Sequence, residues 1–328
     1  MNLFDYKGHF RQLSEAPFFF LLLLFAACNP SPQTTSSLIP LPEINGEAIS
    51  FLGDTLQRPT EDEITFHQKD SLLQESYAMY LADSTDLDNI IWYGRRLAYL
   101  HRYKDAIDIF TKGLRYFPNA PELYRHRGHR FITLRRLDDA IADLEHGIHL
   151  AQNRKMEIEA DGIPNKLNIP LSNLHFNLYY HLGLAYFLKA DYPKAIETYL
   201  SCMKYSDNPD LKVATTDWLY LSYLRTGDLT PAEKWLADIS ADMEIIENNE
   251  YLERLLIYKG VKEPITLTDP TIDPVAFATQ NYGISCWYEM KGQPAEAASI
   301  RRLILSSSFW PAFGYIAAEV DSSRSIAH

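Results

Sequence analysis

The sequence predicts an all-α protein in which antiparallel helix pairs stack side by side in one elongated array. Three features of the sequence predict it. An alanine that follows a short polar turn recurs along the chain. An aromatic or leucine side chain stands nine residues before each copy, and a glycine stands twelve residues before the first three. The chain of 328 residues is also longer than one compact core usually organises.

The overall composition excludes several classes of protein. Hydrophobic residues make up 46% of the chain and glycine only 14 residues, so bulk disorder and collagen-like structure are excluded. Basic residues number 31 and acidic residues 43, a net charge of -12, which argues against a nucleic-acid partner. Three cysteines cannot build a disulfide framework.

The first expected element is a signal peptide over residues 1–27. An uncharged apolar run over residues 18–27 ends at Cys28. Ten helical residues rise about 15 Å, roughly half a bilayer core, so the run is too short to span a membrane. Two alanines directly before Cys28 resemble a bacterial lipoprotein cleavage box, which implies cleavage there and acylation of Cys28. Ordinary secretion and a misassigned start are the alternatives, because the leader lacks a basic start and carries Phe25.

Acylation of Cys28 would anchor the chain to a membrane surface. We therefore expect the protein in the cell envelope, anchored by its lipid to a bacterial membrane. The preferred membrane is the outer membrane, with the protein facing the periplasm. Residues 28–60 are expected to form a tether or extended linker, because residues 29–37 carry no apolar periodicity. An N-terminal capping helix is expected over residues 61–86, and the solenoid over residues 87–328.

Five copies of the alanine motif mark five predicted helix pairs. Small residues near the middle of one helix let its antiparallel partner approach closely, and an aromatic residue one turn later fills the space between successive pairs. The small residues of the first three pairs are Gly94, Gly128 and Gly183. The five alanines are Ala106, Ala140, Ala195, Ala232 and Ala297.

The first spacing, from Ala106 to Ala140, sets the length of one repeat, and two later spacings depart from it. The spacing from Ala140 to Ala195 is longer by more than half a repeat, which predicts an insertion over residues 152–172. The spacing from Ala232 to Ala297 is close to two repeats, so a degenerate unit is expected to use residues 243–259. A further helix around residues 311–320 is expected to cap the end of the array.

The spacing from Ala106 to Ala140, with these small and aromatic positions, resembles the period of about 34 residues that is typical of the tetratricopeptide repeat (TPR). The resemblance is strong in the first three pairs and weaker in the last two, where Tyr220 replaces the small residue and Arg301 replaces an aromatic or leucine. It implies a TPR-type antiparallel helix-pair solenoid, a right-handed superhelix with a concave groove lined by the first helices. Residues 124–130, 162–165 and 180–186 are similar to segments of exported bacterial TPR proteins of the lipoprotein type.

In this family certain first-helix positions face the groove where partner peptides bind. Three of the matching residues, Arg95, Arg125 and His129, would form a basic spot that pairs with the carboxylate of an acidic or C-terminal peptide segment. The alternative is that the arginines are solvated or form intramolecular pairs. The groove positions implied by the resemblance are Arg95, Tyr99, Arg125, His129, Tyr180 and Phe187, with Asp217, Arg225, Tyr282 and Glu289 in the weaker repeats.

No recognisable catalytic or metal-binding constellation is present in the sequence. The pairs His126/His129 and His146/His149 have i,i+3 spacing, but no third ligand shares their faces convincingly. No Gly-rich phosphate loop, zincin helix or nucleophile elbow occurs. Cys202 and Cys286 are expected to be buried and inert. We therefore expect no enzyme activity, no metal and no cofactor.

The expected function is that of a non-enzymatic cell-envelope scaffold or adaptor that binds a protein partner segment in the concave groove. The insertion over residues 152–172 is expected to be either an ordered plug over the groove's edge or a plain surface loop. The alternative function is a small-molecule or glycan receptor. Its basis is the content of 21 tyrosines and 5 tryptophans, together with an insertion that could close an aromatic pocket over Tyr180.

Overall fold

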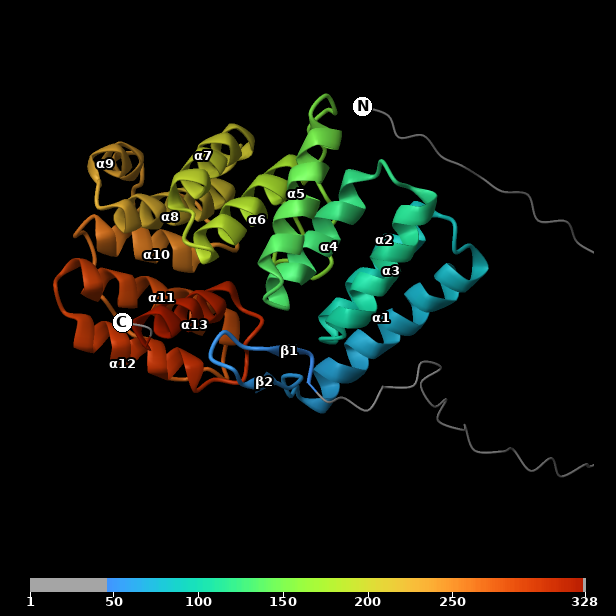
Figure 1. Ribbon diagram of the computed structural model, residues 1–328, viewed down its shortest axis with the longest axis horizontal. Helices are drawn as coiled ribbons and strands as arrows, with labels where there is room; N and C mark the ends of the chain where they lie inside the picture. The colour runs from blue at the N-terminus through green and yellow to red at the C-terminus, as the bar shows by residue number, and fades with distance from the viewer. Residues whose placement is uncertain (1–45, 327–328) are drawn as a thin grey trace, which may run out of the picture. The chain divides into compact units, whose positions relative to one another are not determined.

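The computed structural model describes residues 46–326, and within them the chain is mainly helical (Figure 1). Those residues contain thirteen α-helices and one hairpin of two-residue strands. The predicted all-α array of TPR-type helix pairs is confirmed. The predicted signal peptide, Cys28 and most of the predicted tether lie outside the described residues.

The first three predicted pairs form as expected. In each pair, two antiparallel helices are joined by a tight turn, and the recurring alanine lies near the start of the second helix. Ala106, Ala140 and Ala195 are completely buried. The helices are α2 (Leu87–Tyr99) with α3 (Tyr103–Tyr116), α4 (Pro121–Thr133) with α5 (Leu137–Ala151), and α6 (Leu174–Leu188) with α7 (Tyr192–Cys202).

The glycines of the first helices lie at close approaches between helices, as predicted. A Cβ atom added at Gly94 would stand 2.3 Å from the ring of Phe110 on α3. At Gly183 it would stand 2.7 Å from the ring of Tyr199 on α7. Because no side chain larger than a hydrogen fits at these positions, the two helices of each pair can interlock.

The turn inside every pair has the same backbone conformation. The residue five positions before the alanine has a positive φ, between 57° and 80°. In the first pair its N–H donates to the Ala98 carbonyl at 3.0 Å, and the next N–H donates to the Leu97 carbonyl at 2.9 Å, which is a Schellman motif. The five turn residues are His101, Arg135, Ala190, Gly227 and Gly292.

This shared turn identifies the fourth and fifth pairs, whose sequence signal is weak. They are α8 (Pro209–Thr226) with α9 (Thr230–Ala237), and α11 (Pro274–Met290) with α12 (Pro294–Leu305). Between them the expected degenerate unit contributes only one helix, α10 (Asn249–Tyr258). It packs between α8 and α11, and no second helix follows it before α11.

The N-terminal part of the described chain contains a hairpin and a helix. Strands β1 (Ala48–Ile49) and β2 (Thr55–Leu56) pair antiparallel. Helix α1 (Glu63–Ala82) follows, its N-terminus is capped by the Asp62 side chain, and it packs against α2. The hairpin lies in the segment predicted as a tether.

The last helix, α13 (Phe313–Ile326), turns back toward the first three pairs. Its Phe313 side chain contacts residues of α4 and α6, and Arg324 donates a hydrogen bond to the Leu188 carbonyl at 2.7 Å. Figure 1 shows α11, α12 and α13 beside the β1–β2 hairpin. The C-terminal helices therefore cover part of the inner side of the array, which the sequence did not predict. None of the helices within residues 46–326 has the length and apolarity needed to cross a membrane.

Candidate functional site: a cavity on the inner side of the array

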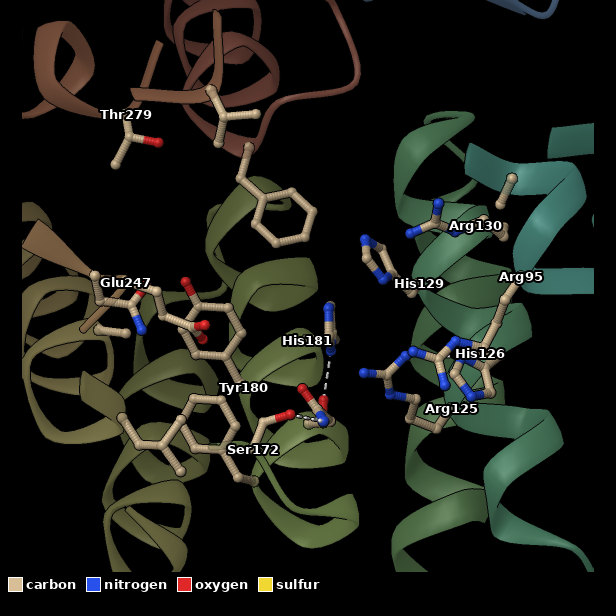
Figure 2. Close-up of a pocket in the computed structure, with 18 of the residues that line it drawn as sticks. Arg95, Arg125, His126, His129, Arg130, Ser172, Tyr180, His181, Glu247 and Thr279 are labelled. Carbon is tan, nitrogen blue, oxygen red and sulfur yellow. Dashed lines mark hydrogen bonds between the residues drawn. The ribbon is translucent and has the colours of Figure 1, made fainter. Parts of the chain in front are cut away.

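A cavity of about 400 Å³ lies between the first helices of the early pairs and the C-terminal half of the chain. Helices α2, α4 and α6 supply one side, and residues of α8, α10, α11 and α13 supply the other. Figure 2 shows arginines and histidines gathered on one side, with Glu247 and Thr279 on the other. The size falls within the range of ligand pockets.

Helix α4 provides the basic wall of the cavity. Arg125, His126, His129 and Arg130 all line it. Spacings of three to five residues place them on one face of the helix. The sequence resemblance pointed to Arg125 and His129 but not to Arg130. The spacing of four residues between His126 and Arg130 was the signal that could have found it.

Arg125 and Arg95 are already engaged by the insertion. Arg125 Nη2 lies 3.0 Å from Glu159 Oε2, and Arg125 also donates to His126 Nδ1 at 2.8 Å. Arg95 Nη2 donates to the Ala160 carbonyl at 2.9 Å. Of the two alternatives that the sequence left open for these arginines, the structure shows intramolecular pairing.

Arg130 differs from its neighbours because its guanidinium has no hydrogen-bond or ion-pair partner within residues 46–326. It lies 5.4 Å from the centre of the Tyr103 ring, a cation–π contact that leaves its donors unused. Burial lowers the pKa of Arg130 to about 10, so it is still charged at neutral pH. It is therefore the cation on this wall that is available to a ligand.

Three histidines surround Arg130 and Arg125. The rings of His129 and His181 lie 4.2 Å apart, and His181 Nδ1 is 2.5 Å from the Asn177 carbonyl. That carbonyl can only accept, so the Nδ1 atom of His181 carries the proton. Burial lowers the pKa of His181 to about 3 and holds the pKa values of His126 and His129 well below their usual range. These rings are neutral at pH 7.

Aromatic side chains form the middle of the cavity and are held in fixed positions. The hydroxyls of Tyr180 and Tyr251 lie 2.8 Å apart, and Trp218 Nε1 donates to the Tyr180 hydroxyl at 2.9 Å. The ring of Phe176 stacks on that of Tyr180 at 5.2 Å. Phe176, Tyr180 and Tyr251 line the cavity with Phe313 and give it an apolar centre next to the basic wall, while Trp218 lies behind them.

Two carboxylates lie on the side opposite the arginines. Glu247 accepts a hydrogen bond from Asn165 at 3.1 Å. Glu250, in the first turn of α10, is half-buried and has no ion pair with any residue of the described chain. Burial raises the pKa values of both carboxyls.

The insertion is ordered and covers the edge of the cavity. Its two ends pair through an antiparallel bridge between Ile158 and Asn173, and Glu159 N–H donates to the Ser172 carbonyl at 2.9 Å. Gly162 sits against Tyr99, where a Cβ atom would lie 1.8 Å from the tyrosine hydroxyl. These contacts hold part of the insertion against the chain, while most residues of 152–170 are exposed.

The structure brings together five of the six groove residues named for the first three pairs. Arg95, Tyr99, Arg125, His129 and Tyr180 all line the cavity. Phe187 does not, because it is 2% exposed and its ring packs edge-to-face on Trp218 at 5.2 Å.

The four positions named in the weaker repeats are all engaged within the chain. Asp217 forms a completely buried pair with Arg254 at 2.7 Å, and Arg225 pairs with Glu289 at 2.7 Å. The Tyr282 hydroxyl donates to Asp321 at 3.1 Å. None of the four lines the cavity.

Comparisons with known proteins find likeness in the fold only. No family model matches the sequence, and no curated protein matches it. A crystal structure of MamA is 18% identical over 62% of this chain and 92% of that chain, with a TM-score of 0.40. A structure of YrrB, described as a TPR protein with an unusual peptide-binding site, is 13% identical over 71% of this chain and 92% of that chain, with a TM-score of 0.40.

A complex of Naa15 and Naa10 bound to HypK-THB is 15% identical over 74% of this chain and 35% of that chain, with a TM-score of 0.35. Scores this low carry no argument about function. The fold assignment rests instead on the five turns, the buried alanines and the helix pairs of this chain.

The described residues also bear on metal and thiol chemistry. Within residues 46–326 no three histidine, cysteine, aspartate or glutamate side chains are grouped to hold a metal ion. Cys202 and Cys286 are buried, and burial raises both thiol pKa values to about 12. Both thiols are therefore protonated and unreactive at neutral pH.

Proposed function

We propose that this protein is a non-catalytic binding module that takes the carboxylate end of a ligand into its inner cavity. The observation that supports this is the unpartnered Arg130 guanidinium beside aromatic walls. A guanidinium binds a carboxylate through two parallel N–H donors, which Arg130 has free and Arg125 does not.

The carboxylate could come from the C-terminus of a partner protein, which keeps the role of a scaffold or adaptor, or from a small molecule. An extended peptide running along the whole groove fits less well, since the insertion already occupies Arg95 and Arg125. A cavity of about 400 Å³ favours a chain end or a small ligand. The contacts of the insertion with Arg95 and Arg125 at the edge of the cavity support the receptor alternative for a small molecule.

Calorimetry with peptide pairs tests the proposal. Four-residue peptides with a free C-terminus should bind, and the same peptides with a C-terminal amide should bind at least about tenfold more weakly. Replacing Arg130→Gln should remove that difference. The matched control is Arg302→Gln, an exposed arginine on α12, which should change nothing.

The outcomes separate the two sources of the carboxylate. If longer N-terminal extensions keep the affinity, the ligand is a partner's C-terminus. If only short peptides or small aromatic acids bind, the small-molecule receptor is favoured. If a neutral sugar binds and Arg130→Gln leaves its affinity unchanged, the carboxylate proposal is wrong and the glycan alternative takes its place.

We also propose that the chain is displayed in the bacterial cell envelope through a lipid on Cys28, with the outer membrane and its periplasmic face preferred. The supporting pattern is the apolar run with two alanines directly before that cysteine. A Cys28→Ser chain expressed in a bacterial host should leave the membrane fraction. Equal membrane association of both chains would contradict lipid attachment at this residue.

A further inference from the structure

We propose that the ligand carries a cationic group opposite its carboxylate, so that the cavity binds a zwitterion with Arg130 at one end and Glu250 at the other. This rests on the proposed function and names its ligand class. The cation would be the amino group of a short peptide, or a basic side chain close to the C-terminus of a longer one.

The first line of support is that charges of opposite sign face the same cavity without pairing. Arg130 has no acidic partner among the described residues, and Glu250 has no basic one. Both side chains line the cavity, but no ion pair joins them, so their charged atoms lie beyond ion-pair distance. A ligand that carries both charges could contact each of them.

The second line of support is the setting of the other charges at the cavity. Arg125 pairs with Glu159, and Arg95 donates to the Ala160 carbonyl. Glu247 accepts a hydrogen bond from the Asn165 side chain and is exposed, whereas Glu250 is half-buried. Glu250 stands in the first turn of α10, a favourable place for any acid because of the helix dipole. That position stabilises the carboxylate, but it leaves its charge without a cation inside a half-buried site.

The third line of support is the apolar centre between the two ends. The rings of Tyr180 and Phe313 lie 6.4 Å apart and both line the cavity. A volume of about 400 Å³ is near the small end of ligand pockets. A molecule with charged ends and an apolar body, such as a tripeptide with a central hydrophobic residue, matches this order of groups.

The test uses tripeptides Ala-X-Ala, with X alanine, leucine, phenylalanine or lysine, each in four forms. The forms are free at both ends, N-acetylated, C-amidated, and blocked at both ends. Affinities are measured by calorimetry on the full chain without its leader. The variants are Arg130→Gln and Glu250→Gln, with the exposed Glu244→Gln as control.

At least one X should give a peptide that loses about tenfold or more in affinity on acetylation and again on amidation. Glu250→Gln should remove the effect of acetylation while keeping that of amidation, and Arg130→Gln should do the reverse. Glu244→Gln should behave as the unmodified chain.

Failure of the inference is distinguishable from failure of the proposed function. If acetylated peptides bind as well as free ones while amidation still weakens binding through Arg130, the carboxylate site stands and the zwitterion inference is wrong. If no form of any peptide binds at millimolar concentration, the zwitterion inference is wrong, and the carboxylate site is decided by the four-residue peptides and small aromatic acids described above. Circular dichroism of each variant checks that a loss of affinity is not a loss of fold.

Discussion

Arg135 and Glu319, 184 residues apart in the chain, form a buried ion pair with Arg135 Nη2 2.6 Å from Glu319 Oε2. The other oxygen of Glu319 accepts the Phe51 N–H at 2.7 Å. One carboxylate thus joins the N-terminal hairpin, the turn of the second helix pair and the last helix. The inner side of the array is covered because these three segments meet there.

Replacing Glu319→Ala should reduce the free energy of unfolding by about 3–5 kcal/mol. The reason is that Arg135, whose side chain is 4% exposed, would keep its charge in a buried place without a counter-ion. Urea denaturation followed by circular dichroism measures the change. Loosening of the C-terminal helices should appear in hydrogen exchange as faster exchange in α13.

The neighbouring pair Arg136–Asp139 provides a matched control. Its atoms lie 2.7 Å apart, but its side chains are 51% and 50% exposed. Asp139→Asn should therefore cost less than about 0.5 kcal/mol. Equal losses for Glu319→Ala and Asp139→Asn would contradict the role given to the buried pair.

The turns of the helix pairs predict a gain in stability from Ala190→Gly. Ala190 has a φ of 62°, a conformation that costs an L-residue about 1 kcal/mol relative to glycine. The fourth pair already has Gly227 at the same place, with a φ of 80° and open space around its Cα. Thermal or urea unfolding should show Ala190→Gly more stable by up to about 1 kcal/mol.

The reverse change, Gly227→Ala, should destabilise by a similar amount, and because nothing lies within 4 Å of the added Cβ the loss is conformational. A loss of stability in Ala190→Gly would show that another contact of this alanine outweighs the turn strain.

The fold of the pairs was predictable from the sequence because each pair is built from local contacts. A glycine twelve residues before an alanine predicts which helix faces approach, and Gly94 and Gly183 lie at those approaches. The covering of the inner side was not predictable. It depends on single long-range partners such as Glu319, whose sequence neighbourhood resembles any amphipathic helix.

The candidate site was predicted in part for the same reason. The resemblance to the TPR implied groove positions for Arg95 and Arg125, and both residues line the cavity. It could not show that Glu159, in an insertion with no repeat pattern, would pair with Arg125. Because the insertion engages Arg95 and Arg125, Arg130 is the arginine of this wall that is left without a partner among the described residues.

The close contact between Gly162 and Tyr99 is expected to hold the insertion in place. Replacing Gly162→Val would push a side chain into Tyr99, since even a Cβ atom would lie 1.8 Å from the hydroxyl. The insertion should lift from the cavity, and limited proteolysis near Asn165 should become faster while helicity is kept. Lys166→Ala, at an exposed position of the same insertion, serves as control and should leave the cleavage rate unchanged. Rapid cleavage of the unmodified chain would contradict the ordered plug.

The buried histidines predict that the protein is sensitive to acid. Their pKa values are lowered by burial, to about 3 for His181 and about 4 for His101, whereas an unfolded histidine titrates near 6.5. Between these values the unfolded chain binds protons that the folded chain does not, so stability is complete above about pH 7 and falls as the pH drops below about 6.5. Within that window each such histidine should lower the free energy of unfolding by about 1.4 kcal/mol for every unit by which the pH falls.

Urea denaturation at several pH values between 7.5 and 5 measures this slope. His181→Gln should lower the number of protons taken up on unfolding by about one, because glutamine does not titrate and can still donate to the Asn177 carbonyl. His67→Gln is the control, since the His67 side chain is 68% exposed and should not contribute. A slope that His181→Gln leaves unchanged would mean that the ring has nearly the same pKa in the folded and the unfolded chain. Below about pH 6.5 the cavity wall would then carry a further positive charge beside Arg130, and carboxylate binding at that pH would no longer depend on the arginine alone.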